Sequence, residues 1–205
     1  MNISNLPWSL IIEALGFIVG LLYLWWEYHA DRRLWYASVV MPMISMWIYF
    51  SKGLYADFAI NIYYLVIAVY GFRAWSRKNS GKEENSKENQ EKKSLPIISI
   101  PKKHLAGCAG MFLLLWALIY LSLEHFTDSN VPLADAFTTA MSIVGMWMLA
   151  RKYIEQWMAW ILVDIVCICL FIYKGIYLYA ILYTIYTVIA LLGYRKWQRL
   201  MRQDN

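Results

Sequence analysis

The sequence has few of the residues that build catalytic and metal sites. Its 205 residues include only three cysteines and three histidines. The cysteines lack the paired spacing of a zinc site and the histidines stand singly, so we expect no metal and no cofactor. No serine or cysteine is placed near a base. An enzyme is therefore the weakest functional class for this chain, and the cysteines, which all lie in apolar runs, are expected to pack.

Charge is also scarce, and it is segregated. Charged residues make up 16% of the chain, against roughly 25% in ordinary soluble domains. All Lys and Arg residues except Lys52 and Lys174 gather in four clusters, and no basic patch is set on a soluble fold, which argues against a nucleic-acid partner. With 60% hydrophobic residues and a mean hydropathy of +0.43, the chain is predicted to be an integral protein of the lipid bilayer.

Apolar runs of about 20 residues, the length that spans a bilayer, are separated by charged and turn-forming residues. Glu13 interrupts the first run and no Lys or Arg precedes it, so we interpret it as a retained helix rather than a signal peptide. The charged stretch from 76 to 103 is expected to be a disordered cytoplasmic linker. The predicted transmembrane helices are 8–28, 34–50, 54–75, 104–123, 133–150, 154–172 and 176–197.

The distribution of positive charge predicts the orientation of these helices. If the N-terminus lies outside, the inside loops hold every Lys and Arg except Lys52 and Lys174. Positive residues concentrate on the cytoplasmic side of membrane proteins. We therefore expect seven helices, with the N-terminus outside and the C-terminus in the cytoplasm.

An internal repeat accounts for this arrangement. Residues 52–75 and 174–197, aligned without gaps at an offset of 122, agree at ten of 24 positions, including Lys-Gly at one end and Gly-x-Arg-x-Trp at the other. The same offset pairs Trp35 with Trp157. The predicted fold is all-α, with two parallel three-helix bundles (1–75 and 133–205, the latter with a cytoplasmic tail) joined by helix 104–123. Substrate sites in parallel-repeat transporters lie near the midplane, between the repeats.

The stretch EQWMAWILVD, residues 155–164, contains the strongest candidate site. Trp157, Trp160 and Asp164 are spaced three and four apart and share a helix face. A charged residue at the bilayer centre costs at least ~2.5–3.5 kcal/mol, so an acid there usually faces a cavity, a partner or a substrate. Aromatic faces beside a carboxylate favour a planar cation.

Other embedded polar and aromatic residues extend the candidate site. Asn61 shares a face of helix 54–75 with Asp57 and Tyr64, and Tyr183 and Tyr186 lie on the equivalent helix of the second repeat. Hydrogen bonds between helices are the structural alternative for the polar groups. We predict that Asn61, Tyr64, Tyr183 and Tyr186 bind substrate, with Glu13 and Asp57 as supporting polar groups.

Several motifs together resemble the PnuC family of bacterial vitamin transporters. They are IEALGxIxGLL near the start, GLYADxxxNxYY and YGFRAW on helix 54–75, RKYIEQWMAW before helix 154–172, and YKGIYLYAxLYxxYxxxAxxGYRKW at the last helix. The resemblance implies a fold similar to the SWEET transporters, with full-length bundles, in the inner membrane. It also implies facilitated diffusion of nicotinamide riboside, thiamine or riboflavin, followed by trapping through a cytoplasmic kinase.

The family's substrate-contacting positions differ in this chain. Its WxxWxxxN motif maps onto Trp157, Trp160 and Asp164, with acid in place of amide, while its helix-three Gln maps onto Asn61 and a helix-two Asn onto Met41. Nicotinamide riboside, the family's defining substrate, and thiamine therefore both stay open, because both are flat cations. A membrane scaffold subunit without transport activity is the alternative from another class, and a homo-oligomer is left open.

Overall fold

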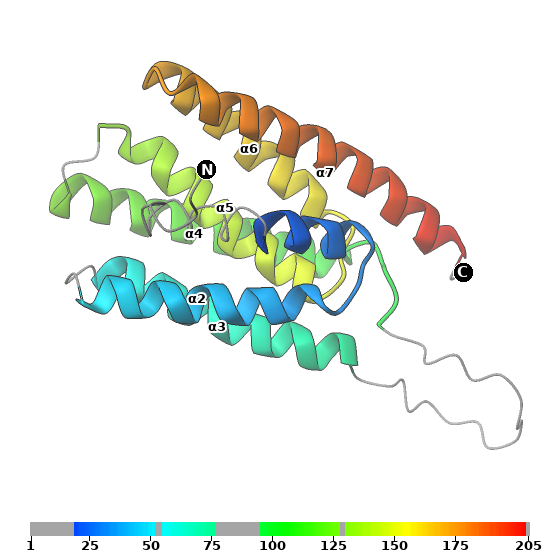
Figure 1. Ribbon diagram of the computed structural model, residues 1–205. Coiled ribbons are helices and arrows are strands. Elements are labelled where there is room, and N and C mark those ends of the chain that lie inside the picture. The colour runs from blue at the N-terminus through cyan, green and yellow to red at the C-terminus, as the bar shows by residue number, and fades with distance from the viewer. Residues whose placement is uncertain (1–18, 52–54, 77–94, 128–129, 204–205) are drawn as a thin grey trace, which may run out of the picture. The chain divides into compact units, whose positions relative to one another are not determined.

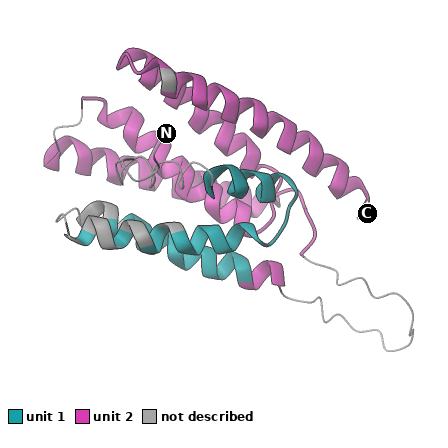
Figure 2. Ribbon diagram, in the orientation of Figure 1, with its two compact units in different colours: residues 1–72 teal, residues 73–205 magenta. Residues whose placement is uncertain are grey.

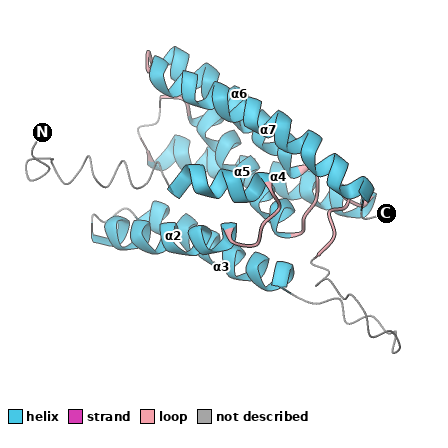
Figure 3. Ribbon diagram, turned by 45° about the vertical axis from the view of Figure 1, so that its right-hand side comes forward, coloured by secondary structure: helices cyan, strands magenta, loops and turns pink. Residues whose placement is uncertain are grey.

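The computed structural model describes residues 19–51, 55–76, 95–127 and 130–203. These residues are helical apart from turns and a short extended segment before α4 (Figure 3). The chain divides into two compact units, Met1–Phe72 and Arg73–Asn205 (Figure 2). The sequence therefore forms the all-helical fold that its apolar runs predict.

Unit 1 contains the helical residues 19–28, then α2 (Leu34–Ser51) and α3 (Tyr55–Ser76), whose last turn belongs to unit 2 (Figure 1). Aromatic pairs join α2 and α3 near both ends. The ring centroids of Tyr36 and Phe72 are 5.3 Å apart, and those of Phe50 and Phe58 are 5.6 Å apart. Because the start of α2 meets the end of α3, the two helices are antiparallel.

A tight turn connects residues 19–28 to α2. Ala30 adopts the left-handed conformation at φ 53°. The next residue, Asp31, accepts hydrogen bonds from the backbone N–H of Arg33 at 2.9 Å and from its Nε at 2.8 Å. These bonds hold the pKa of the Asp31 carboxyl below its usual range. The carboxylate therefore fixes the direction in which α2 begins.

Unit 2 contains α4 (Lys102–Phe126), α5 (Pro132–Ala150), α6 (Gln156–Tyr173) and α7 (Tyr177–Gln203), and each packs against the next in sequence (Figure 1). Pro132, which cannot donate an intrahelical hydrogen bond, occupies the first turn of α5. Gly175 adopts φ 71° in the turn between α6 and α7, where a side chain would be strained. Unit 2 is thus a chain of antiparallel helices joined by short connections.

Within the described residues, α4, α5 and α6 are long and apolar enough to span a membrane. Only 6% of the apolar window of α4 is buried, and leucines such as Leu113 and Leu118 are exposed on it. In a bilayer such a surface is solvated by lipid tails. The described helices begin and end within a few residues of the predicted bounds, except that α7 continues past 197 to Gln203. Its last residues, although charged, are mostly good helix formers.

Residues 95–100, which the sequence places in the linker, pack against the turn between α5 and α6. Ile98 exchanges backbone hydrogen bonds with this turn, donating to Lys152 at 3.2 Å and accepting from Ile154 at 3.1 Å. The Glu155 carboxylate accepts hydrogen bonds from Ser99 Oγ and, at 2.9 Å, from the backbone N–H of Ile100. We call residues 95–100 the strap, because they fasten the start of α4 to the α5–α6 turn.

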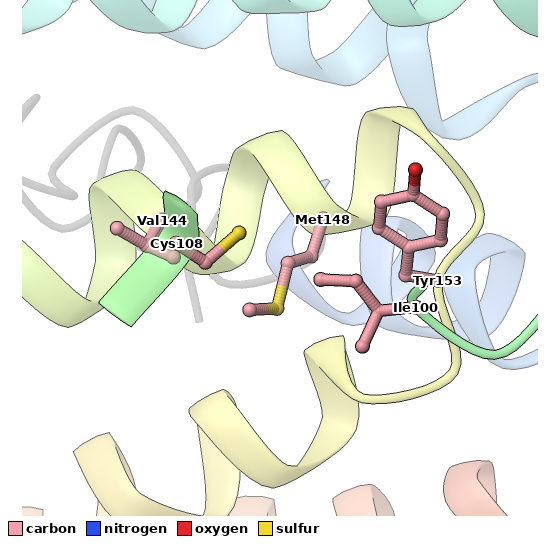
Figure 4. Close-up of a cluster of buried hydrophobic side chains, with 5 residues drawn as sticks. All are labelled: Ile100, Cys108, Val144, Met148 and Tyr153. Atoms are coloured by element: carbon pink, nitrogen blue, oxygen red, sulfur yellow. The ribbon is translucent and has the colours of Figure 1, made fainter. Parts of the chain in front are cut away.

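A buried cluster lies directly behind the strap. Figure 4 shows its side chains coming from the strap, α4, α5 and the α5–α6 turn. Tyr153 extends the cluster through its hydroxyl, which lies 2.7 Å from His104 Nδ1. Apolar packing thus reinforces the backbone pairing of the strap. The buried members are Ile100, Cys108, Val144, Met148 and Tyr153.

An aromatic layer lies beside the same turn. Trp75 donates from its indole Nε1 to the carbonyl of Ala150 at 3.2 Å, and Lys152 Nζ lies 4.4 Å from the centroid of the Trp75 ring. The Trp75 ring also pairs with Trp197, at 6.3 Å between centroids. A lysine that is only 3% exposed is therefore stabilised by an aromatic face.

The same local geometry occurs twice, 122 residues apart. Lys152 adopts φ 54°, as Ala30 does at φ 53°. A methyl group at Gly71 would lie 2.3 Å from the Trp35 ring. One at Gly193 would lie 2.5 Å from the Trp157 ring. In both units, then, a left-handed turn precedes a helix whose first tryptophan packs directly on a glycine of another helix.

The contact between Trp157 and Gly193 generates the first prediction. Gly193→Ala is expected to destabilise the protein by about 1–3 kcal/mol, the usual cost of overpacking, because the added methyl group would overlap the indole. Thermal unfolding of the purified chain measures this effect. Gly110→Ala is the control, since its Cβ would meet no atom within 4 Å. Equal unfolding temperatures for the two variants would contradict the role of this contact.

The strap generates the second prediction. Glu155→Ala leaves the Ser99 hydroxyl and the Ile100 N–H without their acceptor, so we expect a loss of about 1–3 kcal/mol in stability. Proteolysis between residues 95 and 101 should accelerate in the same variant. Glu124→Ala, at an exposed position on α4, is the matched control. Unchanged proteolysis in the Glu155 variant would show that the strap is held by other contacts.

Candidate functional site

Unit 2 places an acid among aromatic groups inside its membrane helices. Asp164, on α6, is only 6% exposed, and within the described residues it forms no ion pair. Its carboxylate is close enough to Tyr183 and Tyr186 of α7 to act on them electrostatically. An ionised carboxylate buried without a cationic neighbour is costly, and the cost is relieved when the group takes up a proton or when a partner or ligand supplies a positive charge.

The two tyrosines belong to a larger aromatic group between α6 and α7. The ring of Tyr183 lies 5.6 Å from that of Tyr186 and 5.3 Å from that of Phe171. Tyr183 also lies within electrostatic range of the Cys167 thiol, one turn of α6 beyond Asp164. The structure thus brings three predicted residues, Asp164, Tyr183 and Tyr186, into one group.

The two tryptophans on α6 have different surroundings. Trp157 is 1% exposed, with its ring on Gly193 and in an edge contact with Trp197 at 5.6 Å between centroids. Trp160 is half-buried, and a methyl group at Gly145 of α5 would lie 3.7 Å from its ring. Trp157 is therefore held between α6 and α7, while Trp160 lies toward α5.

Unit 1 holds the other predicted polar residues. Asn61, on α3, is 9% exposed. Tyr64, half-buried one turn further on, lies 5.7 Å from Tyr63 between ring centroids. The predictions for Glu13 and for the side chains of Asp57 and Met41 lie outside the described residues.

Sequence reasoning missed a buried acid in unit 1. Glu27 is 2% exposed, and its carboxylate is hydrogen-bonded to Tyr23 one turn earlier. Tyr23 in turn lies within electrostatic range of Tyr64. Glu27 directly precedes the polar stretch YHADRR, so the sequence pattern predicts that it lies at an exposed helix end. Its spacing of four from Tyr23 was the available signal.

A helix pair with a buried carboxylate beside several aromatic rings, as α6 and α7 of unit 2 provide, can hold a flat cation. The carboxylate supplies the opposite charge, and aromatic faces add about 2 kcal/mol or more when the contact is free of water. These features define a multi-pass helical membrane protein with polar groups buried among its helices. Such groups commonly mark substrate pathways in transporters.

Comparison with known proteins identifies the family. The model of the nicotinamide mononucleotide transporter family matches residues 10–199. The chain belongs to this family, which confirms its resemblance to PnuC proteins.

Curated relatives and a solved structure agree with this assignment. The chain is 26% identical over 215 residues to the nicotinamide riboside transporter PnuC of Escherichia coli (strain K12), covering 94% of this chain and 86% of the relative. It is 24% identical over 203 residues to the riboflavin/roseoflavin transporter RibM of Streptomyces davaonensis, covering 98% and 90%. The crystal structure of the vitamin B3 transporter PnuC shares its fold, with a TM-score of 0.62 at 19% identity over 92% of this chain and 80% of that one.

Proposed function

We propose that this chain is an inner-membrane facilitator for a non-phosphorylated, cationic vitamin, with nicotinamide riboside as the leading substrate. The observation that carries the proposal is Asp164, a buried carboxylate on α6 that has no ion pair among the described residues and lies close to Tyr183 and Tyr186. A pyridinium ring supplies the missing positive charge. A phosphate group would be repelled by the same carboxylate, which favours the riboside over the mononucleotide.

The aromatic and amide groups complete the proposed binding chemistry. Trp157 and Trp160 would stack on the flat ring, and Tyr183 and Tyr186 would close the pocket around it. The packing of Trp157 on Gly193 would also hold α6 against α7. We propose that Asn61 and Tyr64 contribute hydrogen bonds, and that Glu13 and Asp57 support them. The substrates named for the relatives are nicotinamide riboside and riboflavin, and both compounds contain a flat ring. These relatives give no support to thiamine.

We also propose that the chain contains two parallel three-helix repeats, joined by α4, with the N-terminus outside. The matched left-handed turns at Ala30 and Lys152 support this duplication, as do the matched contacts of Trp35 with Gly71 and Trp157 with Gly193. Rocking of parallel repeats about a fixed site provides alternating access. Transport would run downhill, and a cytoplasmic kinase would trap the product as a phosphate.

The RibM relative favours a second candidate substrate, riboflavin. Riboflavin is flat but neutral, so it would use the aromatic groups and gain nothing from the charge of Asp164. Competition between riboflavin and nicotinamide riboside for uptake distinguishes the two candidates.

The third prediction concerns energy coupling. Purified protein in liposomes should take up labelled nicotinamide riboside, saturably, until the inside and outside concentrations are equal, without an ion gradient or ATP. Empty liposomes are the control. Accumulation above the outside concentration, or strict dependence on a gradient, would contradict facilitated diffusion.

The fourth prediction concerns the charge of Asp164. Asp164→Ala, which removes both the charge and the hydrogen-bonding group, should raise the KM for nicotinamide riboside about tenfold, equivalent to about 1.4 kcal/mol. The KM for the dihydro form of the riboside, which has nearly the same shape but a neutral ring, should not rise. Glu124→Gln, at an exposed position on α4, controls for loss of a negative charge. If the ratio of the KM values for the cationic and the dihydro form is the same in the Asp164 variant as in the wild type, the carboxylate does not discriminate between a charged and a neutral ring.

A further inference from the structure

One face of α7 carries an exposed row of side chains that changes from apolar to basic. The positions recur at alternating spacings of four and three, which keeps them on one side of the helix. The apolar part is Ile181, Ile185, Val188 and Leu192, each between 47% and 59% exposed. The basic part is Arg195, Arg199 and Arg202, which are also exposed. We call this face the α7 stripe.

The α7 stripe lies opposite the face that packs in unit 2. Within this unit, α6 is the helix that packs along α7 (Figure 1). The contacts come from residues such as Gly193, which meets the Trp157 ring, and Trp197. At 3.6 residues per turn, both lie on the other side of α7 from the stripe. Packing within unit 2 therefore leaves the stripe uncovered.

The three guanidinium groups have no acidic neighbour. None of them forms an ion pair or a hydrogen bond with the part of the chain that the structure describes. The arginines therefore do not serve the internal packing of unit 2. Guanidinium groups match the geometry of phosphate oxygens and can bind them through two parallel hydrogen bonds. The basic part of the stripe is accordingly suited to a phosphate group.

The apolar part has the length of one lipid leaflet. From Ile181 to Leu192 the helix rises about 16 Å, at 1.5 Å per residue. Half of the hydrocarbon core of a bilayer is about 15 Å thick. Helical side chains lean toward the N-terminus of their helix, so the arginines reach back toward Leu192. The stripe thus presents an apolar surface for an acyl chain directly beside groups for a phosphate.

Charge argues against a second copy of this chain on the stripe. Copies of a membrane protein share one orientation, so two stripes in contact would place arginine against arginine. Juxtaposed like charges disfavour such an interface. The headgroup ammonium of a zwitterionic lipid would likewise be repelled by three arginines. A lipid with a net negative charge avoids this repulsion.

We propose that the α7 stripe binds one anionic phospholipid. Its acyl chain lies along Ile181 to Leu192, and its phosphate is held by the arginines, with Arg195 nearest the hydrocarbon. This site is separate from the proposed vitamin site, and the inference does not rest on which substrate is carried. It assigns a ligand to a surface that the packing of unit 2 does not use.

The test measures how tightly single lipids bind to the purified full chain. Native mass spectrometry of the chain in detergent, titrated with phosphatidylglycerol or with phosphatidylcholine, gives the dissociation constant of the first bound lipid. We expect wild type to prefer phosphatidylglycerol about fivefold, equivalent to about 1 kcal/mol, the contribution of one basic residue near an anionic surface. Glycerol phosphate, which has no acyl chain, should not displace the bound lipid.

Two triple variants test where the lipid binds. The stripe variant replaces Arg195, Arg199 and Arg202 with Gln and should lose the preference for phosphatidylglycerol. The control variant replaces Lys102, Lys103 and Lys174 with Gln, which removes the same charge from exposed positions outside the stripe, and should keep the preference. Should the stripe variant fail to fold, Arg199→Gln alone replaces it, with a smaller loss expected.

Four outcomes would overturn the proposal. They are a wild type without preference, a stripe variant that keeps the preference, an equal loss in the control variant, and displacement of the lipid by glycerol phosphate. An equal loss would mean that net charge attracts the lipid, and displacement would mean that the arginines bind a free anion. A wild-type oligomer that excludes the lipid would place a second copy on the stripe and contradict the proposal as well.

Discussion

The packing of Trp157 on Gly193 is the contact on which the rest of unit 2 depends. It brings α6 against α7 closely enough that no side chain fits at position 193. The same indole meets Trp197, which pairs with Trp75, and Trp75 holds Ala150 at the end of α5. With this frame in place, Asp164, two turns along α6, lies close to Tyr183 and Tyr186 on α7. Helix packing therefore sets the distance between the charge and the rings.

The helices were predictable because their boundaries are set by charge and turn residues, which sequence displays directly. The pairing of Trp35 with Trp157 at an offset of 122 was also visible, but its physical meaning was not. Only the structure shows each ring lying on a glycine. The strap was missed because residues 95–100 are short and follow a charged linker. Their order depends on Glu155, far away in the sequence.

Part of the candidate site was also predictable, because a charged residue inside an apolar run is visible in the sequence. Asp164 stands out as an acid in an apolar run, and helical spacing placed it with Trp160. Glu27 and Gln156 were overlooked, because both adjoin polar residues at helix ends, where composition suggests exposure. Their burial, 2% and 0% exposed respectively, depends on tertiary packing that no local pattern reveals. The different surroundings of Trp157 and Trp160 likewise follow from which neighbouring helix each ring meets.

Binding of nicotinamide riboside to the folded, purified protein tests the central claim most directly, since a transporter must bind its substrate and a scaffold need not. At 100 times its dissociation constant, a ligand stabilises the folded state by about 2.7 kcal/mol. The account predicts a concentration-dependent rise in the unfolding temperature of the wild type and a clearly smaller rise in an Asp164→Leu variant at the same ligand concentration. If the unfolding temperature does not change when nicotinamide riboside, riboflavin or thiamine is added, the proposal of a transporter is contradicted and a membrane scaffold is favoured.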